Sequence, residues 1–119
     1  MLDDVPALPI ADLAAERAVL AAVLLDNATW WSMVDIVAVA DFYDPRHSLL
    51  WEIVGTIIAR REPVDVLTVV AELRARDRIN TVGGAQYVGE LTDEIPTLSH
   101  CESHARIVRD LARTRRIEE

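Results

Sequence analysis

The clearest helix start in this chain of 119 residues lies at residues 41–47, which read Asp-Phe-Tyr-Asp-Pro-Arg-His. Asp44 is suited to cap a helix because its carboxylate can accept hydrogen bonds from amides of the first turn. Pro45 fits the first helical position, where its missing N–H would have no helical partner. Behind it, apolar residues recur every three or four positions at Leu50, Ile53, Val54, Ile57 and Ile58. We therefore predict a long central helix that buries a broad apolar stripe.

The same helical period continues on the N-terminal side of this segment. Residues 1–11 contain two prolines and are expected to form an irregular leader. Asp12 is a suitable cap for a first helix, which we expect to stop before Asn27. A second helix is predicted from residue 30 to 39, with Thr29 as its cap.

On the C-terminal side the pattern predicts three more helices. The fourth is capped by Asp65 and is followed by a turn over residues 80–84. A short fifth helix is expected over residues 85–93, closed by Pro96, and a sixth runs from residue 97 or 99 to the chain end.

No segment alternates apolar and polar residues over the length that a β-strand needs. We therefore predict an all-α fold, a compact globule of about six helices formed by residues 12–119. A chain of this length forms one domain with a single modest core. The residues predicted to lie in that core are Leu20, Leu24, Phe42, Leu50, Val54 and Leu73.

The formal charge of the chain is −8, and it is unevenly distributed. Residues 1–59 hold nine carboxylates against two arginines, a balance of −7, whereas residues 60–119 hold eleven against ten, a balance of −1. Proteins that bind nucleic acid neutralise phosphates with clustered cations, so this composition argues against DNA binding by the domain alone. We expect a protein partner instead.

Cysteine content and hydropathy indicate the compartment. Because Cys101 is the single cysteine, an internal disulfide is excluded, which is consistent with a reducing compartment. The N-terminus lacks the basic and apolar regions of a signal peptide, and no apolar run approaches the ~20 residues of a membrane span. We expect a cytoplasmic protein without a membrane partner.

Three histidines are the main candidates for enzymatic chemistry. His100 and His104 share one face of the last helix, and His47 lies in the first turn of the central helix. A small metal-dependent helical enzyme using His47, His100 and His104 is therefore one alternative function. Zinc usually takes four ligands, or three and a water, and Cys101 points about 100° away from His100 on the helix. We expect no metal, cofactor or catalytic site in this chain and interpret His47 as a packing or hydrogen-bonding residue.

Glycine and arginine patterns have simple structural explanations. The pair Gly83-Gly84 could belong to a phosphate loop, but such a loop needs a preceding strand and a Lys, and this chain has no Lys. We interpret the pair as a turn that requires positive φ angles.

Arginines near the end of the last helix offset its dipole, and Arg106 is placed to pair with Asp110. A direct DNA-binding role is the less favoured alternative for this basic strip, which comprises Arg106, Arg109, Arg113, Arg115 and Arg116.

Trp30 and Trp31 are neighbours on the predicted second helix. Their side chains point about 100° apart, so both cannot enter the same core. Exposed aromatic residues favour protein interfaces, and Trp31 is therefore a candidate partner contact.

Several short stretches combine into a pattern that is specific as a whole. Its residues are Ala15 and Glu16 near the start, Phe42, Tyr43, Pro45 and His47 in the segment quoted above, Asp65 with Val64 and Thr68, and finally Gly83, Gly84, Tyr87 and Leu91. In this order and spacing they resemble the N-terminal domain of the bacterial hexameric replicative DNA helicase of the DnaB type. By this resemblance, residues 12–119 form the helicase N-terminal domain, truncated before its linker and ATPase domain.

The resemblance implies a non-catalytic interaction domain. In that family the domain packs in pairs within a hexameric collar and receives the C-terminal domain of primase, and a helicase loader is a further possible partner. ATP and Mg²⁺ would be bound by the parent's ATPase domain, and single-stranded DNA only by the parent hexamer. The last helix would be the first arm of a hairpin through which subunits pair, with Val108, Leu111 and Ile117 as contact candidates. A second alternative is the helicase-binding domain of primase, which has a similar fold but is not marked by the Asp-Phe-Tyr and Gly-Gly signatures.

Overall fold

The computed structural model describes residues 10–93 and 97–118, and all regular structure in this part of the chain is helical. The predicted all-α fold is therefore confirmed. Most of the expected leader, and Pro96, lie outside the described residues. The elements are α1 (Leu13–Leu25), α2 (Thr29–Met33), η2 (Val39–Asp41), α3 (Pro45–Ala59), α4 (Val66–Ala75), η3 (Ile79–Val82), α5 (Gly84–Glu90), η4 (Leu98–His100) and α6 (Cys101–Glu118), where η marks a 3-10 helix.

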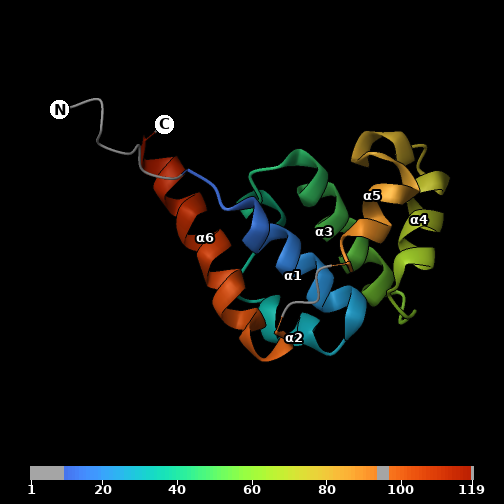
Figure 1. Ribbon diagram of the computed structural model, residues 1–119, viewed down its shortest axis with the longest axis horizontal. Coiled ribbons are helices and arrows are strands. Elements are labelled where there is room, and N and C mark those ends of the chain that lie inside the picture. The colour runs from blue at the N-terminus through green and yellow to red at the C-terminus, as the bar shows by residue number, and fades with distance from the viewer. Residues whose placement is uncertain (1–9, 94–96, 119) are drawn as a thin grey trace.

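Two helices, α1 and α3, lie at the centre of the fold (Figure 1). α1 packs along α6 on one side and against α3 on the other, while α4 packs on α3 and carries α5. α2 lies beside α1 and the start of α6. Of the six residues predicted for the core, five are buried and Leu24 is only partly buried at the edge of the core.

An aromatic cluster fills the space between α2 and α3. The ring centroid of Trp51 lies 4.6 Å from that of Trp30 and 5.6 Å from that of Phe42. A Cβ at Gly55 would lie 3.2 Å from Cη2 of Trp30, so the glycine lets α2 approach α3 closely. Trp31, the next residue on α2, is 69% exposed. The expectation that only one of the adjacent tryptophans enters the core is confirmed.

The three aspartates predicted to begin helices do so. Asp12, Asp44 and Asp65 each accept a hydrogen bond from a first-turn amide, at 2.9, 2.9 and 2.8 Å. Pro45 occupies the first position of α3 as expected, and the hydroxyl oxygen of Thr68 accepts a hydrogen bond from the amide of Asp65. Caps of this kind are typically worth about 1 kcal/mol each.

The predicted extent of the second helix is wrong. It spans Thr29–Met33 instead of 30–39, and Thr29 is its first residue, not its cap. The carboxylate of Asp41 accepts a hydrogen bond from the amide of Ala38 at 2.8 Å, which gives the backbone an alternative to the helical bond. The chain therefore turns into η2 and returns Phe42 to the core.

Other boundaries also differ from the prediction. α6 begins at Cys101, after the 3-10 helix η4, and not at residue 97 or 99. α5 ends at Glu90, and residues 91–93 form a turn. Most of the turn expected over residues 80–84 is the 3-10 helix η3.

α3 and α4 both end with a residue other than glycine in the left-handed region. Arg61 has a φ of 61° and Asp77 a φ of 56°. In each case the following amide bonds back to the carbonyl five residues earlier, at 3.2 Å after α3 and 2.8 Å after α4. This pattern is a Schellman motif, a helix ending in which glycine usually takes the left-handed position.

Candidate functional site: a buried polar cluster and the exposed surfaces

A buried polar cluster at the first turn of α3 joins three helices. Nδ1 of His47 lies 2.8 Å from Oε1 of Glu16 on α1, and these side chains are 0% and 1% exposed. Nε2 of His47 lies 2.6 Å from the hydroxyl oxygen of Tyr87 on α5. Glu16 also accepts hydrogen bonds from the amides of Tyr43 and Asp44, at 2.7 and 3.2 Å. The cluster therefore ties α1 and α5 to the start of α3.

The partners of His47 define its hydrogen-bonding role. A carboxylate only accepts hydrogen bonds, so Nδ1 carries a hydrogen and donates it to Glu16. Three donors in total surround the Glu16 carboxylate, which is the compensation that a buried charge requires. Burial raises the pKa of the Tyr87 hydroxyl, which therefore stays protonated at neutral pH.

Arg46 and Asp44 cover this cluster on the outside. Nη2 of Arg46 lies 2.7 Å from Oδ2 of Asp44, and its guanidinium lies 4.2 Å from the centroid of the Tyr87 ring. The hydrogen bond from Arg46 holds the pKa of the Asp44 carboxyl below its ordinary value of 3.8. The polar atoms of the cluster bond to one another, so we assign it a structural role.

The two adjacent glycines place Tyr87 in this cluster. Gly83 and Gly84 have φ values of 96° and 82°, so the predicted turn with positive φ angles is confirmed. A Cβ at Gly83 would lie 3.3 Å from Cβ of Tyr87. The structure thus brings His47, Gly83 and Tyr87 together, whereas Asp65 lies apart at the start of α4.

The end of α6 is fastened to the segment in front of α3. Arg116 forms an ion pair of 2.6 Å with Asp41, and Arg115 donates to the carbonyls of Asp41 and Ile10, both at 2.7 Å. The Arg115 guanidinium also lies 5.3 Å from the ring centroid of Tyr43, which is 48% exposed. Two arginines of the predicted basic strip therefore bind groups of the chain itself.

The ion pair predicted on α6, between Arg106 and Asp110, is wrong. Arg106 pairs with Glu102 one turn earlier, at 3.3 Å, and Asp110 pairs with Arg109, at 3.0 Å. A carboxylate on the N-terminal side of its arginine is also the favoured order in a helix, which is consistent with the first pair.

Asn27 connects the end of α1 with the segment before α4. Its Nδ2 donates to the carbonyls of Val23 and Val64, each at 2.8 Å, and its Oδ1 accepts from the amide of Val64 at 2.9 Å. One side chain thus satisfies both backbone polar groups of Val64.

The partner-contact candidates differ in exposure. Trp31 is 69% exposed and Ile117 is 85% exposed, whereas Leu111 is partly buried. Val108 is only 2% exposed because α1 packs along α6, so its predicted role as a partner contact is wrong. Ile107, which the sequence pattern did not single out, is 40% exposed on the same helix.

The three histidines do not form a metal site. His47 is enclosed with Glu16 and Tyr87, while the rings of His100 and His104 have centroids 6.4 Å apart at the start of α6. Within residues 10–93 and 97–118, no group of three or more His, Cys, Asp or Glu is placed to hold a metal ion. In the same residues no helix has the length and apolar character needed to cross a membrane.

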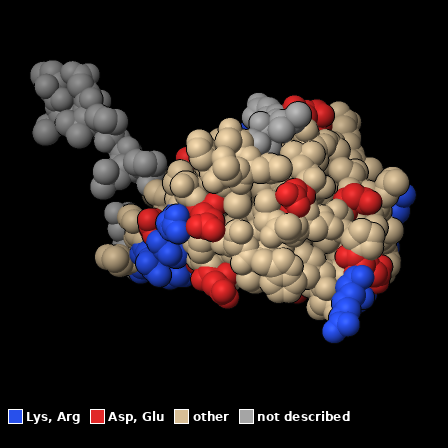
Figure 2. Space-filling model, turned by 90° about the horizontal axis from the view of Figure 1, so that it is seen from below, with Lys and Arg blue, Asp and Glu red and all other residues tan. Residues whose placement is uncertain are grey.

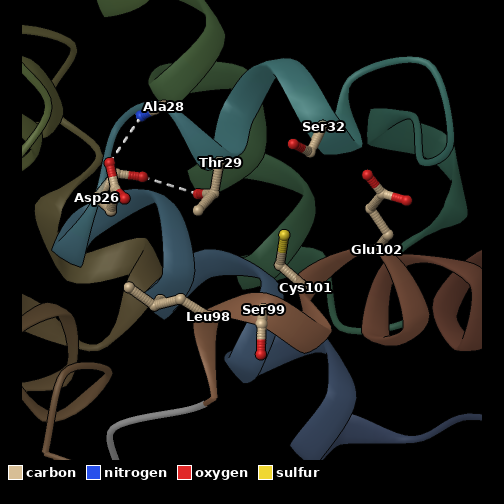
Figure 3. Close-up of a pocket in the computed structure, with 8 residues that line it drawn as sticks. All are labelled: Asp26, Ala28, Thr29, Ser32, Leu98, Ser99, Cys101 and Glu102. Atoms are coloured by element: carbon tan, nitrogen blue, oxygen red, sulfur yellow. Dashed lines mark hydrogen bonds between the residues drawn. The ribbon is translucent and has the colours of Figure 1, made fainter.

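A groove of about 360 Å³ lies between the start of α2 and the start of α6 (Figure 3). Asp26 and Ser32 line it on one side, and Ser99, Cys101 and Glu102 line it on the other. α2 and the start of α6 lie lowest in Figure 1, and Figure 2 shows that side of the molecule. In this view basic side chains gather at the two ends, and the charged groups between them are carboxylates.

Glu16, Asn27 and Asp41 hold distant segments of the chain together, a role that local sequence patterns did not predict. The burial of Glu16 could have been predicted from the sequence, because it lies three and four positions before Val19 and Leu20 on the buried side of α1. A carboxylate on such a face needs a buried partner.

Comparisons with known proteins place this geometry in a family. The family model described as the DnaB-like helicase N-terminal domain matches residues 8–110. The chain is 38% identical to the replicative DNA helicase DnaB of Geobacillus stearothermophilus over 92% of its own length and 24% of the relative. With the DnaB of Mycobacterium leprae it shares 35% identity, over 93% of this chain and 18% of that protein. The chain therefore spans a quarter or less of the length of these relatives.

A solved structure gives the same result. The crystal structure of the N-terminal domain of DnaB helicase from Mycobacterium tuberculosis matches 93% of this chain and 80% of that one, with a TM-score of 0.89 and 34% identity. The fold and the sequence together define the class: an all-α N-terminal domain of replicative DNA helicases. The chain belongs to the family of DnaB-like helicase N-terminal domains. This assignment replaces the alternative of a primase domain.

Proposed function

We propose that this chain is a non-catalytic interaction domain of a replicative DNA helicase. It supports pairing of subunits in the collar of a hexamer, and it docks the C-terminal domain of primase during DNA replication. The observation that carries the proposal is the match to the DnaB N-terminal domain along nearly the whole chain. A helicase loader is a further proposed partner.

The exposed side of α6 supports the pairing role. Ile107 and Ile117 keep 40% and 85% of their surface exposed on a helix at the edge of the molecule (Figure 1). Exposed apolar residues on one helix are suited to a self-complementary contact between two copies. Leu111, which is partly buried, lies beside Ile107 one turn later.

The remaining activities are assigned to the parent protein. ATP and Mg²⁺ would be bound by a separate ATPase domain, and single-stranded DNA by the assembled hexamer. The domain would hold primase close to the unwound DNA and so raise its effective concentration there. The proposed location is the cytoplasm, where bacterial DNA is replicated.

Self-pairing is tested by sedimentation of two proteins over one concentration range. The first is the 119-residue chain, which we expect to be a monomer or a weak dimer. The second extends the natural sequence by about one further helix, which would complete the hairpin and tighten the dimer. Replacing Ile117 by Asp in the longer protein should weaken the dimer, while Leu67→Asp, at an equally exposed site on α4, should not. An unchanged dissociation constant after extension would place the pairing surface elsewhere, with Trp31 as the next candidate.

Primase docking is tested by titrating the C-terminal domain of primase into both proteins in a calorimeter. If the primase domain binds the longer protein only when that protein is dimeric, the result supports a docking site formed by both subunits of the pair. Lack of binding to either protein contradicts the docking role and leaves subunit pairing untouched.

A further inference from the structure

The groove between the starts of α2 and α6 has the chemistry of a cation-binding surface. Among the described residues that line it, the charged groups are the carboxylates of Asp26 and Glu102, and none is a Lys or Arg. Ser32 adds a hydroxyl group on the α2 side, and Ser99 lies on the α6 side. One carboxylate oxygen of Asp26 accepts from the amide of Ala28 at 3.1 Å, and the other has no protein partner within the described residues. The groove therefore offers acceptors in excess of donors.

The interior of the groove is less polar than its edges. Cys101 is 6% exposed, and in Figure 3 its sulfur points from α6 toward α2. Burial raises the pKa of this thiol, so it is uncharged at neutral pH. Leu98 lies on the same side of the groove. An apolar floor below two carboxylates fits a long side chain that has methylene groups and a cationic end.

We propose that this groove binds a basic segment of a partner protein, whose arginine or lysine side chains are held by Asp26 at one end and by Glu102 at the other. The occupant follows from charge complementarity, because the groove has only acidic charges and the first half of the chain has a balance of −7, nine carboxylates against two arginines. This inference deepens the proposed function, because it gives one partner contact a surface and a chemistry. It concerns a different part of the molecule from the exposed isoleucines of α6.

Trp31 extends this surface. Ala28 and Ser32, one turn apart on α2, both line the groove. Trp31 precedes Ser32 and is therefore rotated by about 100° around the helix, which places it outside the groove but next to it. Its ring is 69% exposed and can contact a bound cation through its face.

Arg106 already acts as an internal competitor. It donates to Oε2 of Glu102 at 3.3 Å, and both side chains are about half exposed, 49% and 50%. An exposed pair of this kind contributes little and is easily exchanged. A partner's cation would take the place of Arg106 at Glu102.

The test uses two synthetic peptides and nuclear magnetic resonance of the 15N-labelled 119-residue chain. One peptide, acetylated and amidated, alternates Leu and Arg over six residues, and the other has Gln in place of each Arg. We expect saturable shifts for the Arg peptide at the amides of residues 26–32 and 99–102, and none for the Gln peptide. Asp26→Asn and Glu102→Gln should each weaken binding by about twofold to fivefold, the size expected for a half-exposed ion pair.

Matched variants separate this site from general electrostatic attraction. Glu52→Gln changes the net charge as Glu102→Gln does but lies on α3, and it should leave the affinity unchanged. Arg106→Gln should tighten binding by about twofold, because it frees Glu102, whereas Arg109→Gln should not. The proposal is overturned if the Arg peptide does not bind, or if all acidic variants weaken it equally. If that happens while the extended protein still pairs, only this inference fails and the proposed function stands.

Discussion

Oε1 of Glu16 and Nδ1 of His47 lie 2.8 Å apart, and these side chains are 1% and 0% exposed. The two residues come from different helices, and Glu16 also holds the amides of Tyr43 and Asp44 at the start of α3. A buried carboxylate with three donors is therefore the main polar connection between α1 and α3. Its removal leaves the buried His47 and two partly buried amides without their acceptor.

We expect Glu16→Ala to lower the free energy of unfolding by about 3 to 5 kcal/mol, the usual cost of removing one member of a buried pair. Urea unfolding followed by circular dichroism measures this change. Glu52→Ala on the exposed side of α3 is the control. A midpoint shift no larger than that of the control would show that the cluster does not stabilise the fold.

Phe42→Ala should destabilise the domain by about 3 to 5 kcal/mol, because it removes a buried ring that contacts Trp51. Its neighbour Tyr43 is 48% exposed, so Tyr43→Ala provides a matched control with a much smaller effect. Both are measured by chemical denaturation. Equal midpoints for Phe42→Ala and the wild-type chain would contradict the burial of this ring.

Arg61→Gly should stabilise the domain by about 1 kcal/mol, because glycine adopts a left-handed conformation without the steric cost that a side chain adds. Arg61 has a φ of 61° at the end of α3. The control Arg61→Ala removes the same side chain but keeps the Cβ, so it should give no comparable gain. Thermal unfolding of the two variants separates the effect of the left-handed backbone conformation from the effect of losing the Arg61 charge.

The contribution of Asp44 should depend on pH. Its hydrogen bond from Arg46 lowers the pKa in the folded state, so folding favours the ionised form. The stabilisation is complete above the ordinary value of 3.8 and is lost as the pH falls through the lower folded value. The difference in stability between the wild-type chain and Asp44→Asn should be constant near neutral pH and should shrink below about pH 4. A difference that stays constant down to pH 2 would contradict this assignment.

The isolated chain should not bind duplex DNA at physiological salt. It has a formal charge of −8, and Arg115 and Arg116 are engaged with the chain's own Ile10 and Asp41. Fluorescence anisotropy with labelled duplex and single-stranded oligonucleotides measures this. Salt-sensitive submicromolar binding to single-stranded DNA would instead assign a function to the basic strip.

Local signals in the sequence predicted the starts of α1, α3 and α4 well. Asp12, Asp44 and Asp65 act through first-turn amides two or three residues away, so the information is contained in a few neighbouring positions. The end of α2 was not predictable in this way. It depends on the bond between Asp41 and Ala38 and on the packing of Phe42 against α3, which a helical period does not reveal.

In the polar cluster too, sequence predicted the local feature but not the tertiary contacts. His47 was interpreted from its own position in α3, but its partner Glu16 lies 31 residues earlier and Tyr87 lies 40 residues later. No local pattern connects such distant residues. Val108 and Ile117 are nine positions apart and therefore lie on opposite faces of α6, and α1 covers the face of Val108. Which face another part of the chain covers is a property of the tertiary fold. Val108 was therefore assigned to the wrong contact.

The contact of Asn27 with Val64 has a consequence for local opening of the fold. The amide of Val64 stands outside any helix, yet it donates to a side chain at the end of α1 across 37 residues of sequence. Its hydrogen can exchange with solvent only when Asn27 separates from the segment before α4. The exchange rate of this single amide therefore reports on the contact between the end of α1 and the segment before α4. We expect its hydrogen exchange to be as slow as that of amides in the core helices around it.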